Sequence, residues 1–105
     1  MLSKDKNIET IKQLAEKSFS DCKILLFGSR ARGEHKIDSD YDIILVTKET
    51  LPPKEKIKFR TLFRNVLAKE RIYADIIIQS ESKIERKKQI PGNVIYYAIP
   101  EAILL

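Results

Sequence analysis

The chain has 105 residues, of which 33% are charged, and its 20 basic and 15 acidic side chains give a net charge of +5 that favours anionic partners. This length suits one domain, 1–105, with a core that needs no disulfide, and the single cysteine, Cys22, excludes a disulfide within the chain. The N-terminus is polar, and the longest apolar runs fall far short of the ~20 residues of a membrane-spanning helix, so we expect a cytoplasmic protein with no membrane partner.

The spacing of apolar residues predicts a succession of helices and strands. In chain order, we expect a helix over 5–19, a strand over 23–27, a short helical turn over 29–31, a strand over 41–46, a helix over 54–69, a strand over 72–79, a short helix over 81–88 and a helix over 94–99. The helix over 54–69 is the clearest, because five of its apolar residues have the spacing of a core-facing side: Phe59, Leu62, Phe63, Val66 and Leu67. The order predicts an α/β fold, a small mixed β-sheet with helices packed mainly on one face.

The stretch from Gly28 to Val46 carries the polar residues of a candidate site. Asp40 and Asp42 are two positions apart at the start of an apolar strand, so their side chains point to the same side of it. Two carboxylates this close repel each other unless a cation neutralises them, and hard cations such as Mg²⁺ choose oxygen ligands. Proteins usually hold Mg²⁺ with one or two carboxylates plus substrate phosphates, so the pair predicts a metal site that an anionic ligand completes.

Asp75 is a third candidate ligand. It lies in the apolar run 74–78, where an unpaired charge is costly. If its strand neighbours that of Asp42, then Asp75 faces the same side as Asp40 and Asp42. Three carboxylates around two metal ions can activate a hydroxyl and stabilise a leaving pyrophosphate.

The turn before these aspartates predicts a phosphate-binding element. Gly28 allows a tight turn and a close approach of the backbone to a ligand, and Ser29 adds a hydroxyl. Arg30 and Arg32 could pair with phosphates through their planar guanidinium groups. Each feature alone has an ordinary explanation, as a plain turn, a loop cap, an edge charge or a solvated arginine. Their occurrence together and in order is what favours a site.

The combined pattern resembles a known family. Gly28-Ser29, ten intervening residues, Asp40-Tyr41-Asp42 and a later strand aspartate, Asp75, are similar to the minimal nucleotidyltransferase (MNT) family, with antitoxins of the MntA type, within the polymerase-β-like nucleotidyltransferase superfamily. The resemblance covers residues 23–79 and implies the polymerase-β-like nucleotidyltransferase fold for the whole domain.

The resemblance implies an enzyme that transfers AMP from ATP, or another NMP from its NTP, to an acceptor hydroxyl, with Mg²⁺ as cofactor and release of pyrophosphate. Two Mg²⁺ ions are expected in the active complex. By the resemblance, Asp40 and Asp42 would bind both metal ions, and Asp75 would bind the catalytic one and help to deprotonate the acceptor. Gly28 and Ser29 would hold the triphosphate.

The resemblance also implies a protein partner. Family members of this size pair with a HEPN-type toxin, and the nucleotidyltransferase acts as the antitoxin by adenylylating it. Two other interpretations stay open: a binding module that neutralises its partner without catalysis, and a basic nucleic-acid-binding protein. Nucleic acid is not favoured as the partner.

The apolar residues lead to one more expectation. Ile44, Val46 and Ile77 share the carboxylate side of their strands, and residues 94–105 are expected to be the only segment available to cover them. We therefore predict an apolar patch, shared by this tail and the sheet edge, that another chain buries, either a partner protein or a second copy in a homo-oligomer.

Overall fold

The fold is a mixed four-stranded sheet between two layers of helix. A computed structural model describes residues 5–105, and all statements below concern that part of the chain. The strands are β1 (Lys23–Phe27), β2 (Tyr41–Thr47), β3 (Ala74–Ser80) and β4 (Ile103–Leu104). The helices are α1 (Lys6–Ser18), α2 (Gly28–Arg32), α3 (Pro53–Lys69), α4 (Glu81–Lys87), α5 (Val94–Ala98) and the 3₁₀ helix η2 (Ile99–Glu101).

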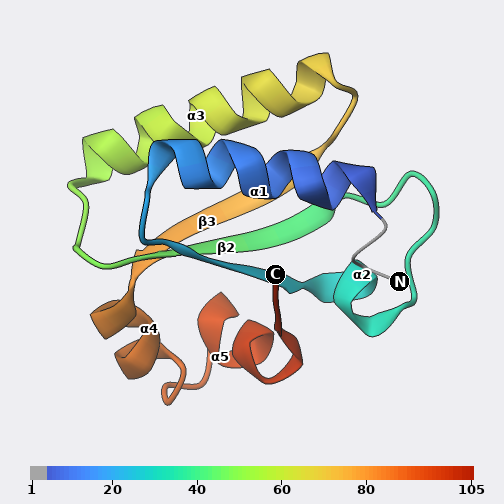
Figure 1. Cartoon of the computed structure of the whole chain (residues 1–105). Helices are drawn as coiled ribbons and strands as arrows, with labels where there is room; N and C mark the ends of the chain where they lie inside the picture. Colours follow the sequence, from blue (N-terminus) through green and yellow to red (C-terminus); the bar gives the residue numbers. More distant parts are fainter. Residues whose placement is uncertain (1–4) are drawn as a thin grey trace.

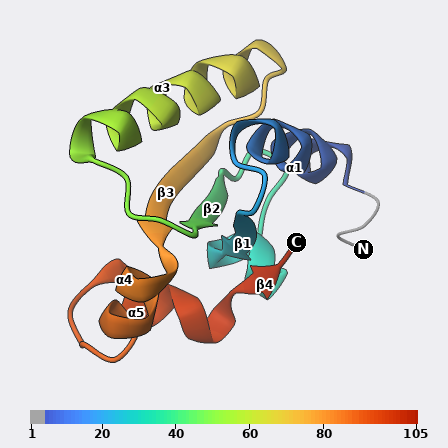
Figure 2. The same cartoon turned by 60° about the vertical axis from the view of Figure 1, so that its left-hand side comes forward.

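The sheet has the strand order β3-β2-β1-β4 (Figure 2). β1 is antiparallel to both β2 and β4, whereas β2 and β3 are parallel, so the predicted mixed sheet is confirmed. The parallel pair requires a crossover, and the 17-residue helix α3 supplies it. β3 is an edge strand, and the two-residue strand β4 forms the opposite edge.

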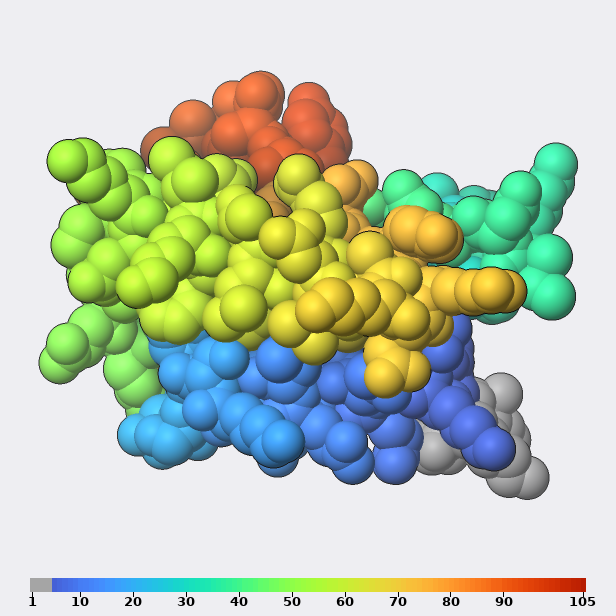
Figure 3. All heavy atoms as spheres, turned by 90° about the horizontal axis from the view of Figure 1, so that it is seen from above, coloured from blue at the N-terminus to red at the C-terminus, as the bar shows by residue number. Residues whose placement is uncertain are grey.

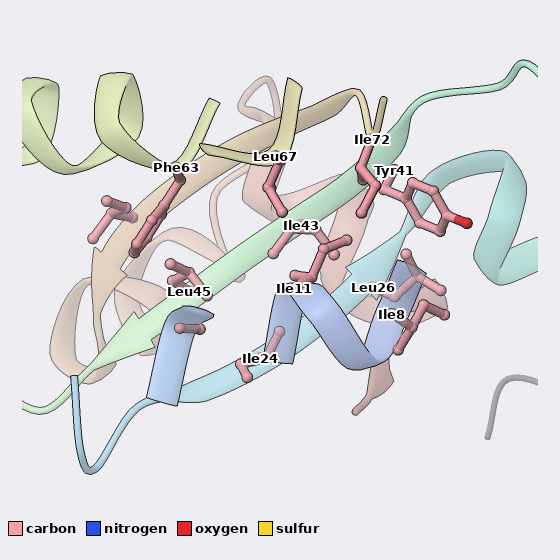
Figure 4. Packing of buried hydrophobic residues seen from close by; sticks show 12 residues of the cluster. Ile8, Ile11, Ile24, Leu26, Tyr41, Ile43, Leu45, Phe63, Leu67 and Ile72 are labelled. Carbon is pink, nitrogen blue, oxygen red and sulfur yellow. The ribbon is translucent and has the colours of Figure 1, made fainter. Parts of the chain in front are cut away.

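Helices α1 and α3 cover one face of the sheet side by side (Figures 1 and 3). The core under them contains Phe63 and Leu67 from α3, Ile8 and Ile11 from α1, and alternate strand residues such as Ile43 (Figure 4). An aromatic group closes one end, where the ring centroids of Phe19 and Phe59 lie 4.6 Å apart. Burial of these apolar side chains is the main force that holds both long helices on the sheet.

Each predicted element lies within two residues of its observed bounds, with one error in the predicted core. The spacing predicts that Leu62 faces the core from α3, but this side chain is 47% exposed. Its neighbour Phe63 is 1% exposed, because α3 meets the sheet through a narrower stripe that Phe63 and Leu67 fill. Among residues 5–105, even α3 lacks the length and apolar content needed to span a bilayer.

The other face of the sheet is covered by the chain itself. Ile44 and Val46 are buried there against Ile84 of α4 and Ile95 of α5. The expectation that residues 94–105 alone could cover this face was therefore wrong, because α4 contributes Ile84. The tail still exposes half or more of three large apolar side chains, those of Val94, Tyr97 and Leu104. Burial of these side chains by a second chain stays a prediction.

Tyr41 ties the first helix to the start of β2. Its ring is buried, and its hydroxyl donates a hydrogen bond to Asp5 Oδ2 at 2.9 Å and accepts one from Asn7 Nδ2 at 3.3 Å. The other carboxylate oxygen of Asp5 accepts hydrogen bonds from the amides of Asn7 and Ile8, so Asp5 also caps α1. One carboxylate thus fixes both the start of α1 and the residue between Asp40 and Asp42.

We expect Tyr41→Phe to lower the free energy of unfolding by about 1 kcal/mol, because it removes a partly buried hydrogen bond to a carboxylate and keeps the ring. Urea denaturation followed by circular dichroism measures the change. Tyr97→Phe is the matched control, since the Tyr97 side chain is exposed and its hydroxyl loss should leave stability unchanged. Equal effects of the two substitutions would contradict the role given to Tyr41.

Candidate functional site

Three residues from neighbouring strands form a row near one end of the sheet. Phe27 pairs with Asp42 in the antiparallel β1–β2 ladder, and Asp42 pairs with Asp75 in the parallel β2–β3 ladder. Residues paired in register point to the same side of a sheet. That side is the one covered by α4 and α5, because Phe27 packs against the cluster around Ile44. The predicted neighbour relation of Asp42 and Asp75 is confirmed.

Asp40 lies just outside this row. It precedes the first residue of β2 and is exposed, as is Asp75, whereas Asp42 is half-buried. The site is therefore open at the Asp40 and Asp75 side and closed around Asp42. An incoming ligand would meet Asp40 and Asp75 first.

Gly28 shapes the closed side of the site. It has φ +75°, a conformation that side-chain-bearing residues rarely adopt. A Cβ atom added at Gly28 would overlap the Asp42 carboxylate and lie 3.0 Å from its Cγ. The backbone at Gly28 thus lies directly against the Asp42 side chain, and only glycine leaves room for it. This contact brings the predicted Gly-Ser turn against one of the predicted carboxylates, that of Asp42.

The charged form of Asp42 is disfavoured in the folded protein. Burial is the largest cause that raises the pKa of Asp42 above its ordinary value, followed by repulsion from Asp75 and Asp40. Arg32 lowers this pKa by attraction, and Glu101 raises it by repulsion. Asp40 and Asp75 are therefore both close enough to act on Asp42, and a bound cation would relieve this repulsion.

The three carboxylates do not by themselves enclose a metal ion. Within residues 5–105, no three His, Cys, Asp or Glu side chains stand close enough together to hold one. The donor set nevertheless fits Mg²⁺, which prefers carboxylate oxygens and commonly takes only one or two of them. Asp42 and Asp75 are the neighbouring pair, and Asp40 lies on the exposed side of Asp42.

Gly28 and Ser29 are the first two residues of helix α2, which is one residue longer at each end than the predicted turn. Gly33 ends this helix with φ +73°, and its amide bonds to the Ser29 carbonyl. The amides at the start of α2 point away from the helix body, as the amides of any helix start do. The predicted phosphate-binding turn is thus a true strand-to-helix turn beside Asp42.

The two predicted arginines have other partners. Arg30 donates hydrogen bonds from Nε to the Ser39 carbonyl at 3.0 Å and from Nη2 to the Ile37 carbonyl at 3.3 Å, and its guanidinium lies 3.9 Å above the Tyr41 ring. Arg30 therefore holds the loop that leads to Asp40, on the side of β2 away from Asp42.

Arg32 pairs with Glu34 and with Glu101, each at 2.7 Å. Its attraction to Asp42 places it near the carboxylates, so Arg32 borders the site and Arg30 supports it. A phosphate group would have to draw Arg32 away from one of these two glutamates.

Glu101 was missed in the sequence. It belongs to η2 and reaches the site through Arg32, 69 positions earlier in the chain. No local pattern around Pro100-Glu101 indicates this contact, because it depends on how the tail folds back under the sheet (Figure 1).

Comparisons with known structures place the fold. A crystal structure of a toxin–antitoxin with AMP-PNP superposes with TM-score 0.52 at 22% identity, over 67% of this chain and 55% of the other. The structure of tri-AMPylated Shewanella oneidensis HEPN toxin in complex with MNT antitoxin gives 0.59 at 16% identity, over 99% and 71%. A Sulfolobus solfataricus protein proposed to be a nucleotidyltransferase gives 0.53 at 24% identity, over 94% and 76%.

These identities are low enough that the superpositions establish the fold alone. The chain spans only 55% of the protein in the structure with AMP-PNP, about half of its length. Among curated proteins, none matches the sequence. The sequence of residues 9–99, however, matches the family described as Polymerase beta, Nucleotidyltransferase, and this range contains every residue of the row and the turn. The chain therefore belongs to the Polymerase beta, Nucleotidyltransferase family.

Proposed function

We propose that this chain transfers a nucleoside monophosphate, preferentially AMP from ATP, to a hydroxyl group of a partner protein, and acts as the antitoxin of a HEPN-type toxin. The observation that carries the proposal is the position of Asp42, which lies between the Gly28 turn and Asp75. One side of Asp42 offers helix-start amides to phosphates, and the other offers a second carboxylate to an acceptor.

In the proposed reaction, different residues bind the phosphates and accept the proton. The start of α2, with Gly28 and Ser29, holds the phosphates, and Arg32 borders them. Asp75 accepts the proton of the acceptor hydroxyl, whose oxygen forms a bond to the α-phosphorus. The bond between the α-phosphorus and the oxygen that bridges it to the β-phosphorus breaks, and pyrophosphate leaves with that electron pair.

Asp40, Asp42 and Asp75 are the residues that would hold Mg²⁺. When bound, Mg²⁺ offsets the charge of the triphosphate and of the leaving pyrophosphate. The mutual repulsion of the three carboxylates supports this assignment, because it makes the site without a cation unfavourable.

The choice of a protein acceptor rests on the exposure of Asp40 and Asp75 and on the structural neighbours. Residues 5–105 form one sheet with its helices, and the exposed side of the site at Asp40 and Asp75 has no further layer over it. One structural neighbour is a HEPN toxin, tri-AMPylated, in complex with an MNT antitoxin, and another contains AMP-PNP. By similarity, a HEPN-type protein is the acceptor to test first.

The test uses the chain, that HEPN-type protein, Mg²⁺ and ATP labelled in the α-phosphate. We expect the label to appear on the partner and to be absent when EDTA replaces Mg²⁺. ATP labelled in the γ-phosphate is the control, since nucleotidyl transfer leaves that label on pyrophosphate. GTP, CTP and UTP with the same α-label measure the base preference.

The same mixtures distinguish the second interpretation. If the partner's toxicity is neutralised with no label transferred, and EDTA leaves the neutralisation intact, the chain is a binding antitoxin and the catalytic proposal fails. Labelling of the partner that parallels its loss of toxicity supports the catalytic one.

A further inference from the structure

A cluster of four cationic side chains surrounds the open edge of β3, away from the carboxylates. Lys56 and Arg60 come from α3 on one face of the sheet, and Lys83 and Lys87 come from α4 on the other. None of the four forms an ion pair with another residue of 5–105. Figure 2 shows α3 and α4 on opposite sides of β3, so the four cations belong to helices in both layers.

The other three cations lie close enough to Lys56 to act on its charge. Burial lowers the pKa of Lys56, and the charges of Lys83, Lys87 and Arg60 lower it further. Lys56 Nζ donates a hydrogen bond to Gln79 Oε1 at 3.1 Å, which brings a side chain of α3 around the strand edge to the α4 side. Four like charges held together without an acidic partner favour an anionic ligand.

A pocket of about 200 Å³ lies beside two of the four cations, Lys56 and Arg60. Lys56, Arg60 and Gln79 supply its polar wall, and Ile57, Ile77 and Ile78 are among its apolar residues. Ile78 packs into the core under α3, whereas Ile77 packs on the α4 side, so the pocket wraps around the edge of the strand. A ligand in it would meet apolar surface and positive charge together.

We propose that the edge of β3 is a docking site for an extended, acidic segment of another protein, which adds to the sheet as a fifth strand. β3 is an edge strand of seven residues, so one row of its backbone groups has no strand partner among residues 5–105. An added strand supplies those hydrogen bonds. Its acidic side chains point to the α4 face and pair with Lys83 and Lys87, and its apolar side chains point to the α3 face and fill the pocket beside Ile57.

The lining of the pocket favours a protein segment over a nucleic acid. Single-stranded nucleic acid is usually held by aromatic side chains that stack on bases, and none of the residues that line this pocket is aromatic. Phosphate contacts alone would not use the apolar wall formed by Ile57 and Ile77. The chemistry therefore matches alternating acidic and apolar side chains on an extended backbone.

The test measures binding of a fluorescent peptide of about eight residues, alternating Glu and Val, to the full chain at low ionic strength by fluorescence anisotropy. We expect saturable binding, weakened about tenfold or more by Lys83→Glu with Lys87→Glu, and by a smaller factor with Lys83→Gln and Lys87→Gln. The control is Lys6→Glu with Lys69→Glu, which makes the same change in net charge at exposed positions outside the cluster and should change Kd less than about twofold.

Two further probes test the mode and the class of ligand. A peptide with the same side chains but N-methylated at every residue has no N–H group to donate to the strand edge, and we expect it to bind about tenfold more weakly. Equal binding of the methylated peptide, equal losses in both charge-reversed proteins, or an absence of binding would overturn the proposal. Tighter binding of an oligo-dT of equal charge would overturn it in favour of a phosphate-polymer site. The assay needs no ATP or Mg²⁺, so its result is independent of the proposed transfer reaction.

Discussion

Replacing Asp42 with Asn is expected to reduce nucleotidyl transfer by at least about 1,000-fold while raising the stability of the free protein. The loss of activity follows from the position of Asp42 between the Gly28 turn and Asp75, since the neutral amide cannot hold a cation beside the phosphates. The amide has nearly the shape of the carboxylate, so the loss would not come from altered packing.

The gain in stability follows from the raised pKa of Asp42, caused by burial first and then by repulsion from Asp75 and Asp40. A carboxyl whose folded-state pKa is raised binds its proton more tightly in the folded state than in the unfolded state. Its stabilising contribution is therefore fully present below the unfolded pKa and is lost as the pH rises through the folded pKa. At pH 7 the wild-type carboxylate is charged and unfavourable, and Asn removes that charge.

The size of the gain is expected to stay below about 1 kcal/mol, because solvent screens the repulsion at this half-buried group. Urea denaturation at pH 7 in EDTA measures it without interference from Mg²⁺. The difference between Asn and Asp should shrink as the pH falls, because the wild-type carboxyl then takes up its proton. Asp21→Asn, in an exposed turn outside the site, should alter neither activity nor stability by a comparable amount.

The two effects have opposite signs, which separates a functional carboxylate from a structural one. A variant that loses activity because it unfolds would show both quantities falling together. Retention of most of the transfer activity by the Asn variant would remove Asp42 from the site, and lower stability would contradict the repulsion among the carboxylates.

The sequence predicted the elements of the fold because each carries a local signal. KILLF and the run after Asp42 are apolar strands, and the long helix has a clear helical period. The same alternation placed Asp40 and Asp42 on one side of β2 and left Asp75 as the one charge in the next strand. The side of the sheet they share was also predictable, since Ile44 and Val46 follow Asp42 in the same alternation.

What the sequence could not predict depends on contacts between distant segments. The pairing of Arg32 with Glu101 requires the tail to return beneath the sheet, and Arg30 turns to the loop carbonyls and to Tyr41 instead of the phosphates. Leu62 has the right spacing for the core but lies beyond the width of the contact between α3 and the sheet. The periodicity of apolar residues describes one helix or strand at a time, so it does not predict how wide the contact between α3 and the sheet is.

Gly28→Ala is expected to lower the free energy of unfolding by about 2–3 kcal/mol and transfer activity by about 100-fold or more. The backbone at Gly28 has φ +75°. This conformation destabilises the fold by about 1–2 kcal/mol when the residue carries a side chain. The remainder arises because the new methyl group would overlap the Asp42 carboxylate and force it to move. A carboxylate displaced by about 1 Å no longer meets the ligand in the productive geometry.

Gly33→Ala is the matched control, because it separates the backbone effect from the contact. Gly33 has φ +73°, almost the same conformation, and a Cβ added there would meet no atom within 4 Å. We expect it to lower stability by about 1–2 kcal/mol and to leave activity nearly unchanged. Similar losses of activity in both variants would show that bending of α2, and not the Asp42 contact, governs the site.

A double-mutant cycle with Asp42→Ala tests the contact directly. Truncating Asp42 removes the carboxylate that the methyl group introduced by Gly28→Ala would strike, so the second substitution should relieve part of the damage of the first. We expect the stability loss from Gly28→Ala to fall, in the Asp42→Ala background, to the level seen for Gly33→Ala. If the loss is the same in both backgrounds, Gly28 is required for its backbone conformation alone. If it falls as expected, the glycine is there to leave room for the carboxylate, and the turn and the metal-binding residues form a single site.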